Sequence, residues 1–323
     1  MNIDMIQAAQ FRLASKARRT PLLSSPFLDD LTGRRILIKP ECLQHTGSFK
    51  FRGAWSAISA LDRGVRAKGI IAFSSGNHAQ GVAHAARMHG TKSVIVMPSD
   101  APQLKIDNTR ALGAEIVLYN RATEDRDAIG DQLSRERDLV LIKPFDNEQV
   151  IAGQGTVGLE IAEQSAELGA DTATVLVPCG GGGLTAGIAL ALAAKAPAMQ
   201  VHPVEPEGFD DVARSLKSGQ LETCTRTTGS VCDAILTPSA GAITFPIMKN
   251  NCGAGQIVSD DDCLRAMAQA YNRLKLVVEP GGAAALAAAL YHHDKLQNDT
   301  LIVVLSGGNV DASVFKSALD KYG

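Results

Sequence analysis

The sequence predicts an α/β fold in which parallel sheets are covered by helices on both faces. Short β-rich runs alternate with longer helical patterns along almost the whole chain. Several of these runs lead directly into small or glycine residues that open the next helix, as at 70–78 and 173–184. At 323 residues the chain exceeds one minimal core, so we expect one enzyme-sized unit divided into two lobes.

The expected elements follow in chain order. The N-terminal segment is typical of an amphipathic helix, because apolar residues recur at near-helical spacing from Ile3 to Leu13. The expected strands are Arg35–Lys39, Ile70–Ser74, Ser93–Met97, Glu115–Tyr119, Leu139–Lys143, Ala173–Val177, Val201–Val204 and Leu301–Leu305. The expected helices between them include Ala79–Met88, Gln103–Leu112, Thr156–Leu168, Leu184–Ala194 and Asp260–Leu274.

The lobe boundaries are predicted from one cluster of these elements. Three strand–helix units lie between about Gly69 and Pro144 and end in the polar, turn-prone sequence PFDNEQ. We therefore expect a small lobe at 69–145 and a larger lobe, discontinuous in sequence, formed by 1–68 and 146–323.

Composition narrows the class of partner. The chain has 32 basic and 34 acidic residues and a net charge of -2, which gives no reason to expect a polyanion such as nucleic acid. A small neutral or zwitterionic ligand fits better. No signal peptide and no stretch long and apolar enough to cross a membrane is present. The six cysteines are scattered without a CxxC pair, so we expect reduced, mostly buried thiols in a cytoplasmic protein.

The first candidate for chemistry is Lys50 in KPECLQHTGSFKFRGA, a segment that follows an expected strand and opens a helix. A lysine is placed unfavourably in the first turn, because that turn is the positive end of a helix. Phe49 and Phe51 flank it, and desolvation beside these rings would lower the pKa of the amine and favour Schiff-base chemistry. A solvated surface lysine is the alternative from local sequence alone.

The second candidate is IIAFSSGNHAQG, where a strand runs through Ser74, Ser75 and Gly76 into a helix that starts near Asn77 and His78. Small residues at such a junction expose backbone amides, and a helix N-terminus favours an anion. The segment therefore suits a substrate carboxylate. An ordinary turn with Asn77 as a structural cap is the alternative.

The third candidate is the glycine run Gly180–Gly183 in VLVPCGGGGLTAG, between a buried strand and a helix. Backbones without Cβ let several amides converge on one phosphate, whose charge the helix dipole stabilises. Gly181, Gly183 and Ala186 also match the dinucleotide pattern GxGxxG/A, with Glu205 near the position of a ribose-binding acid. A nicotinamide-dependent dehydrogenase is therefore an alternative.

Two further strand ends carry candidate ligands. LIVVLSGGN ends in Ser306 to Asn309, at the edge where ligands of open α/β sheets bind. VEPEGFDD brings Glu205, Asp210 and Asp211 together after a strand. Such acids either hold a hard cation or cap the next helix.

Taken together and in this order, TGSFKFRGA, SSGNHAQG, IAGQGT, GGGGL, VEP and SGGN resemble the fold-type II pyridoxal-phosphate enzymes, which share a two-lobed, tryptophan synthase β-like fold. The closest resemblance is to the threonine/serine dehydratase and serine racemase branch, and it spans essentially the whole chain. The combination is far more specific than any single motif, so it overrides the dinucleotide interpretation. It implies pyridoxal 5'-phosphate as cofactor, a small amino-acid substrate and a homodimer.

The resemblance also implies residue roles. Lys50 would form the internal aldimine, Phe49 would pack beside the cofactor ring and Asn77 would bond the ring hydroxyl. Ser306 would bond the pyridine nitrogen. The phosphate would be bound by Gly180, Gly181, Gly182, Gly183 and Leu184. The substrate carboxylate would be bound by Ser74, Ser75, Gly76 and His78. A divalent cation, Mg²⁺ or Ca²⁺, would be bound by Glu205, the carbonyl of Phe209 and Asp211.

The implied activity is that of a dehydratase, an ammonia-lyase that converts L-threonine, L-serine or a similar 3-hydroxy amino acid to a 2-oxo acid and ammonia by β-elimination. The amine of Lys50 would remove the Cα proton. Ser75 stands where the racemases carry a catalytic serine, so amino-acid racemisation is an alternative. Cys232, Asp233 and Ala234 replace the usual Ala-Asp-Gly near the cofactor, so 3-hydroxyaspartate is a further candidate substrate.

Overall fold

The strands form two separate sheets in the computed structural model, which describes residues 1–74, 76–101, 103–120, 122–226 and 228–323. The larger sheet has the order β1-β2-β10-β7-β8-β9 and the smaller one β5-β4-β3-β6. The larger sheet consists of β1 (Leu23–Ser24), β2 (Arg35–Pro40), β7 (Ala173–Pro178), β8 (Met199–Pro206), β9 (Gln256–Val258) and β10 (Thr300–Leu305). The smaller sheet consists of β3 (Ile70–Phe73), β4 (Ser93–Pro98), β5 (Glu115–Tyr119) and β6 (Val140–Leu141).

All strand pairs are parallel except β1 with β2, which confirms the predicted α/β class. The helices are α1 (Ile3–Leu13), α2 (Pro26–Thr32), α3 (Lys50–Ser59), α4 (Arg63–Ala67), α5 (Asn77–Met88), α6 (Gln103–Ala111), α7 (Arg126–Glu136), α8 (Glu148–Glu167), α9 (Gly183–Lys195), α10 (Asp211–Ser218), α11 (Thr244–Asn251), α12 (Asp260–Gln269), α13 (Pro280–Tyr291) and α14 (Ala312–Tyr322).

Helices cover both faces of the larger sheet. Along β2, Ile36 and Ile38 pack into one core with α12 and α13, whereas Leu37 packs into another with α8 and α9. Along β10, Val303 and Ile302 divide in the same way. Successive side chains of a strand point to opposite faces, so a strand buried on both faces is apolar throughout. Strands such as β7 and β10 therefore lack polar alternation, whereas β8, closer to the sheet edge, exposes Gln200.

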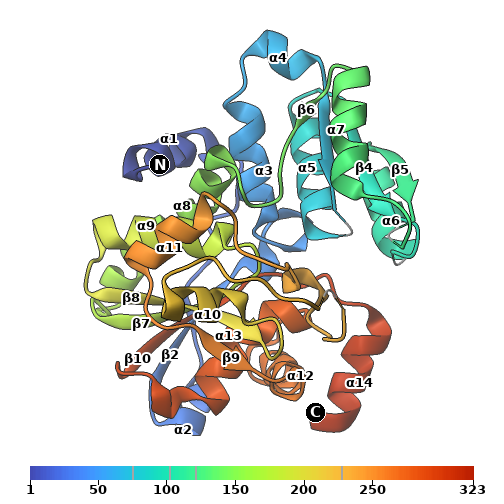
Figure 1. The fold of residues 1–323 in the computed structure, drawn as a ribbon. Coiled ribbons are helices and arrows are strands. Elements are labelled where there is room, and N and C mark those ends of the chain that lie inside the picture. The colour runs from blue at the N-terminus through green and yellow to red at the C-terminus, as the bar shows by residue number, and fades with distance from the viewer. Residues whose placement is uncertain (75, 102, 121, 227) are drawn as a thin grey trace.

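The smaller sheet is covered in the same manner. Ile70 and Ala72 pack with α3 and α5, whereas Ile71 and Phe73 pack with side chains of α7. Figure 1 shows this sheet with α5, α6 and α7 at the upper right and the larger sheet at the lower left. Helix α3 packs against both α5 and α8, so it lies where the two parts of the chain meet. The lobe boundaries at 68 and 145 stay a prediction.

Several predicted boundaries differ from the structure, and two of the differences concern the elements around 139–156. Helix α8 begins at Glu148 rather than Thr156, because the side chain of Asn147 caps it by accepting bonds from the N–H groups of Gln149 and Val150. The predicted strand Leu139–Lys143 is reduced to β6, which pairs with β3 alone.

The cysteines agree with the sequence prediction. All six are free, and Cys42, Cys179, Cys232 and Cys263 are buried. Among the described residues, no helix combines the length and apolarity that a membrane span requires.

Candidate active site

The carboxyl ends of strands from both sheets meet around the start of α3. Ser48 forms a β-bridge with Gly307, just after β10. The N–H of Phe49 donates to the carbonyl of Ser306 at 3.2 Å. Helix α5 packs closely against the start of α3. A methyl group added at Gly81 would lie 3.0 Å from the carbonyl carbon of Lys50. The structure therefore brings Phe49, Lys50 and Ser306 together, and their predicted roles stay a prediction.

Lys50 is the first residue of α3, in agreement with its predicted position in the first turn. Its amine donates to the carbonyl of Pro144 at 2.9 Å and lies 5.1 Å from the ring centroid of Phe49. Desolvation lowers the pKa of Lys50 to about 8, although the charge of Glu279 acts in the opposite direction. At neutral pH a measurable fraction of the amine is unprotonated, which nucleophilic or base chemistry requires.

The start of α5 presents backbone rather than ring donors. Gly76 precedes the helix, and its N–H bonds the hydroxyl of Ser74 at 3.2 Å. The ring Nε2 of His78 lies 3.0 Å from the carbonyl of Ile142, so this nitrogen carries the hydrogen. Burial lowers the pKa of His78 to about 3, and the neutral ring leaves Nδ1 as an acceptor. Ser75 lies outside the described residues.

Asn77 is held from both sides. Its Nδ2 donates to Oε1 of Glu279 at 2.5 Å, and its Oδ1 accepts from Nδ2 of Asn309 at 2.7 Å. The same Nδ2 of Asn309 donates to the carbonyl of Thr46 at 2.8 Å. This chain of four residues, which we call the Glu279–Thr46 chain, joins segments that follow β2, β3 and β10 with the start of α13.

Glu279 is a buried acid that the sequence analysis did not select. Burial raises its pKa to about 7, and Asp233 adds to this effect, whereas the bond from Asn77 opposes it. A methyl group at Gly307 would collide with Oε1 of Glu279, so the glycine leaves room for the carboxylate beside Ser306. Glu279 lies directly before Pro280 at the start of a helix, a position that predicts at most a helix cap. Only the fold shows that it faces Asn77.

The glycine run connects β7 to the N-terminus of α9. Gly182 adopts a φ of 85°, which strongly favours glycine, and it is the N-cap of α9. A methyl group at Gly181 would collide with the ring of Phe145, the residue after the carbonyl that holds Lys50. Gly180 borders Thr237, with 3.0 Å between an added methyl and its hydroxyl. The loop is therefore packed in place beside the lysine.

Two unpaired polar side chains support anion binding at this loop. Within the described part of the chain, Oγ1 of Thr185 and both amide atoms of Gln154 are buried without a partner. Thr185 is in the first turn of α9, and an added methyl at Gly183 would lie 2.7 Å from Oε1 of Gln154. Leu184 is part of the core, so only its backbone could contact a ligand. A phosphate would supply acceptors for such donors.

The acids after β8 occupy a separate position. Both carboxylate oxygens of Glu205 accept backbone N–H bonds, from Val212 at 2.9 Å and from Ala213 at 2.7 Å. Oδ2 of Asp211 is buried without a partner among the described residues, and burial raises the pKa of both acids. Phe209, which lies between the two acids in the sequence, is also buried. No cluster of three or more His, Cys, Asp or Glu suited to a metal occurs in those residues.

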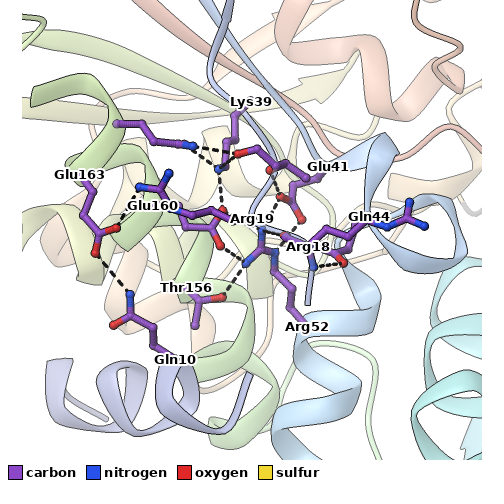
Figure 2. A network of polar contacts seen from close by, with 12 residues as sticks. Gln10, Arg18, Arg19, Lys39, Glu41, Gln44, Arg52, Thr156, Glu160 and Glu163 are labelled. Carbon is purple, nitrogen blue, oxygen red and sulfur yellow. Dashed lines mark hydrogen bonds and ion pairs between the residues drawn. The ribbon is translucent and has the colours of Figure 1, made fainter. Parts of the chain in front are cut away.

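Helix α3 is anchored by a buried ionic network, shown in Figure 2. Arg52 binds Glu41 through two bonds of 2.8 Å and Glu160 through bonds of 2.6 and 2.9 Å. Lys39 completes the network, with its amine 2.6 Å from Glu160. Burial alone would raise the pKa of Glu41, but Arg52 keeps it below its usual value. The network fixes the helix turn that carries Lys50.

An ion pair lies close to the start of α5. The amine of Lys105, on α6, lies 3.3 Å from Oδ2 of Asp233, in the segment where the sequence departs from the usual Ala-Asp-Gly. The side chain of Lys105 is 12 % exposed and passes 3.7 Å from the position of a methyl group at Gly76. Ala234 packs near α13, 3.5 Å from an added methyl at Gly281.

Comparison with known proteins agrees with this geometry. The family model "Pyridoxal-phosphate dependent enzyme" matches residues 13–307. An L-threo-3-hydroxyaspartate ammonia-lyase from Pseudomonas sp is 42 % identical over 98 % of this chain and 97 % of its own. A serine racemase from Oryza sativa subsp. indica is 38 % identical over 99 % and 94 %. The crystal structure of a T.th. threonine deaminase has a TM-score of 0.91 and 45 % identity, covering 96 % of this chain and 99 % of that one. The chain therefore belongs to the family of pyridoxal-phosphate dependent enzymes.

Proposed function

We propose that this protein is an ammonia-lyase that removes water and ammonia from a small 3-hydroxy amino acid and releases a 2-oxo acid. The observation that carries the proposal is the placement of Lys50. Desolvation lowers the pKa of its amine to about 8, and the amine donates to the carbonyl of Pro144, next to Phe145, which packs against Gly181 of the loop before α9. Relatives named as ammonia-lyases for L-threo-3-hydroxyaspartate and L-threonine support the reaction class.

The residues of the site divide the work of binding. Lys50 would hold the cofactor covalently, with Phe49 beside its ring, Asn77 at the ring hydroxyl and Ser306 at the pyridine nitrogen. The N–H groups of the loop Gly180–Leu184 would bind its phosphate, since they lie at the positive end of α9. When bound, pyridoxal phosphate withdraws electrons from the substrate Cα.

The start of α5 would bind the substrate carboxylate. The backbone N–H group of Gly76 directly precedes α5, and that of His78 lies in its first turn. A negative charge is favoured at this end of a helix. The hydroxyl of Ser74 lies beside them. Because the ring of His78 is neutral and donates to Ile142, its contribution would come from the backbone. The amine of Lys50, once free, would accept the Cα proton.

We also propose that Glu205, the carbonyl of Phe209 and Asp211 bind Mg²⁺ or Ca²⁺. The unpaired buried oxygen of Asp211 fits an oxygen-liganded cation. The site lies after β8 rather than beside Lys50, so it would stabilise the fold around α10 rather than react. Addition of Ca²⁺ to metal-free protein should raise the melting temperature, and Asp211→Asn should abolish that increase.

A direct assay tests the proposed reaction. Borohydride reduction of the holoenzyme should label the peptide that contains Lys50. Release of 2-oxo acid should then be measured with L-serine, L-threonine and L-threo-3-hydroxyaspartate. Ammonia without 2-oxo acid, or label on another lysine, would contradict the proposal.

Racemisation is the second candidate, because serine racemases are among the relatives and Ser75 is a serine. Ser75→Ala should abolish interconversion of serine enantiomers and leave elimination largely intact. Interconversion at the parental rate in that variant would exclude the proposed role of Ser75.

We further propose a homodimer in the cytoplasm. The six free cysteines support a reducing compartment, since disulfides are rare there. Light scattering coupled to size-exclusion chromatography would measure the mass of the assembly, and fractionation of the source cells would show the compartment.

A further inference from the structure

Glu279 has a buried carboxylate that the proposed chemistry does not use. It is 2 % exposed and lies at the start of α13, yet its side chain makes no cap bond to that helix. Its carboxylate instead accepts from Asn77, across 202 positions of the sequence. A buried carboxylate requires a compensating interaction, and for Glu279 the bond from Asn77 provides it.

The side-chain amide of Asn77 could be oriented in two ways, with Nδ2 and Oδ1 exchanged. The partners on its two sides remove this freedom. Above its pKa of about 7, Glu279 is ionised and can only accept, so it requires Nδ2 of Asn77. On the other side, the carbonyl of Thr46 can only accept, so the group of Asn309 that faces it must be Nδ2. The same Nδ2 donates to Asn77, which must therefore present Oδ1.

The fixed orientation leaves one hydrogen of Asn77 unassigned. Nδ2 carries two hydrogens, and Glu279 takes one of them. The other remains for an acceptor outside the Glu279–Thr46 chain. In the reversed orientation Asn77 would present an acceptor, which an oxygen anion repels.

We propose that Glu279 is a positioning residue: its carboxylate fixes the amide of Asn77 so that a hydrogen-bond donor faces the ring hydroxyl oxygen of bound pyridoxal phosphate. This inference rests on the proposed contact between Asn77 and that hydroxyl. Gly307 belongs to the same arrangement, because any larger residue there would displace the carboxylate.

The test compares two ligands that differ only at the ring hydroxyl. Equilibrium dialysis of cofactor-free full-length protein would give the affinities for pyridoxal phosphate and for 3-deoxypyridoxal phosphate. The wild type should prefer pyridoxal phosphate. Glu279→Gln should reduce that preference by a factor of about 2–10, the value of one hydrogen bond, because a glutamine amide no longer fixes Asn77.

Glu279→Asp is the second variant. It retains the negative charge but is shorter by one methylene, so it should lose the bond to Asn77 and also reduce the preference. Glu163→Gln is the control, because it makes the same exchange at an acid that pairs with Arg19 at 3.2 Å and is half exposed, and it should keep the wild-type preference. A preference unchanged in both Glu279 variants would overturn the proposal.

The outcomes separate this inference from the proposed contacts. If the wild type binds both ligands equally, the ring hydroxyl does not lie at Asn77, and the inference fails with that placement. If the wild type discriminates and the Glu279 variants discriminate equally well, only the role of Glu279 fails. Equal loss of affinity for both ligands in Glu279→Gln would indicate a structural role at α13 and would also overturn the proposal. The measurement is independent of the reaction catalysed.

Discussion

Replacement of Arg52 by methionine tests whether the buried ionic network holds α3 in place. The variant would leave Glu41 and Glu160 with Lys39 as the remaining buried cation of the network, in place of two cations facing two carboxylates. Breaking a buried pair by removing one partner typically costs about 3–5 kcal/mol of the free energy of unfolding. For a chain of this size, the melting temperature should fall by about 4–7 °C.

Two further variants make this prediction decisive. Arg52→Met combined with Glu160→Gln removes one unpaired carboxylate and should recover about 1–2 kcal/mol relative to Arg52→Met alone. Arg19 is the matched control, because it pairs with Glu163 at 3.2 Å in the same region but is half exposed (Figure 2). Arg19→Met should cost less than about 1 kcal/mol. Equal shifts for Arg19→Met and Arg52→Met in thermal unfolding, or no recovery in the double variant, would refute the reasoning.

The remaining predictions concern the site itself. In cofactor-free protein, acylation of Lys50 should reach half its maximal rate near pH 8, as its lowered pKa requires. Peptide mass spectrometry would follow the modification, and a midpoint near pH 10, the ordinary value for lysine, would contradict the prediction. Gly181→Ala should weaken cofactor affinity at least about tenfold, because the added methyl collides with Phe145, whereas Gly64→Ala, with open space around it, should not. The pKa of Glu279 is raised to about 7, so its contribution to stability is present at low pH and is lost as pH rises through 7. Relative to Glu279→Gln, the wild type should therefore lose on the order of 3 kcal/mol between pH 4.5 and pH 7 in denaturant titrations.

The fold class could be predicted because the strands are buried on both faces. Runs such as 173–178 and 300–305 are apolar except for one threonine each, and the structure places them at the centre of the larger sheet. Helix α13 was not predicted, because its sequence PGGAAALAAALY is buried on every side and shows no amphipathic period. Strand β9 was also missed, since three residues carry too little pattern to be recognised.

The candidate site could be predicted in part for a related reason. Lys50, Asn77 and the glycine run follow strands and open helices, and local sequence shows both features. Glu279 could not be selected, because its partner Asn77 is brought to it only by the packing of α13 against the end of β10. The ring of His78 turns toward Ile142 for a similar reason, since the residue directly after β6 supplies the partner.

The electrostatics of the site follow from where its helices begin. Helices α3, α5, α9 and α13 start at Lys50, Asn77, Gly183 and Pro280, and their positive ends favour anions such as a phosphate or a carboxylate. Desolvation lowers the pKa of Lys50 to about 8. The positive end of α3 also disfavours a protonated amine. The charge of Glu279 opposes that fall, and burial leaves its own pKa at about 7. Burial thus shifts both pKa values toward neutrality, and part of the Lys50 amine is left unprotonated, as a nucleophile or a base requires.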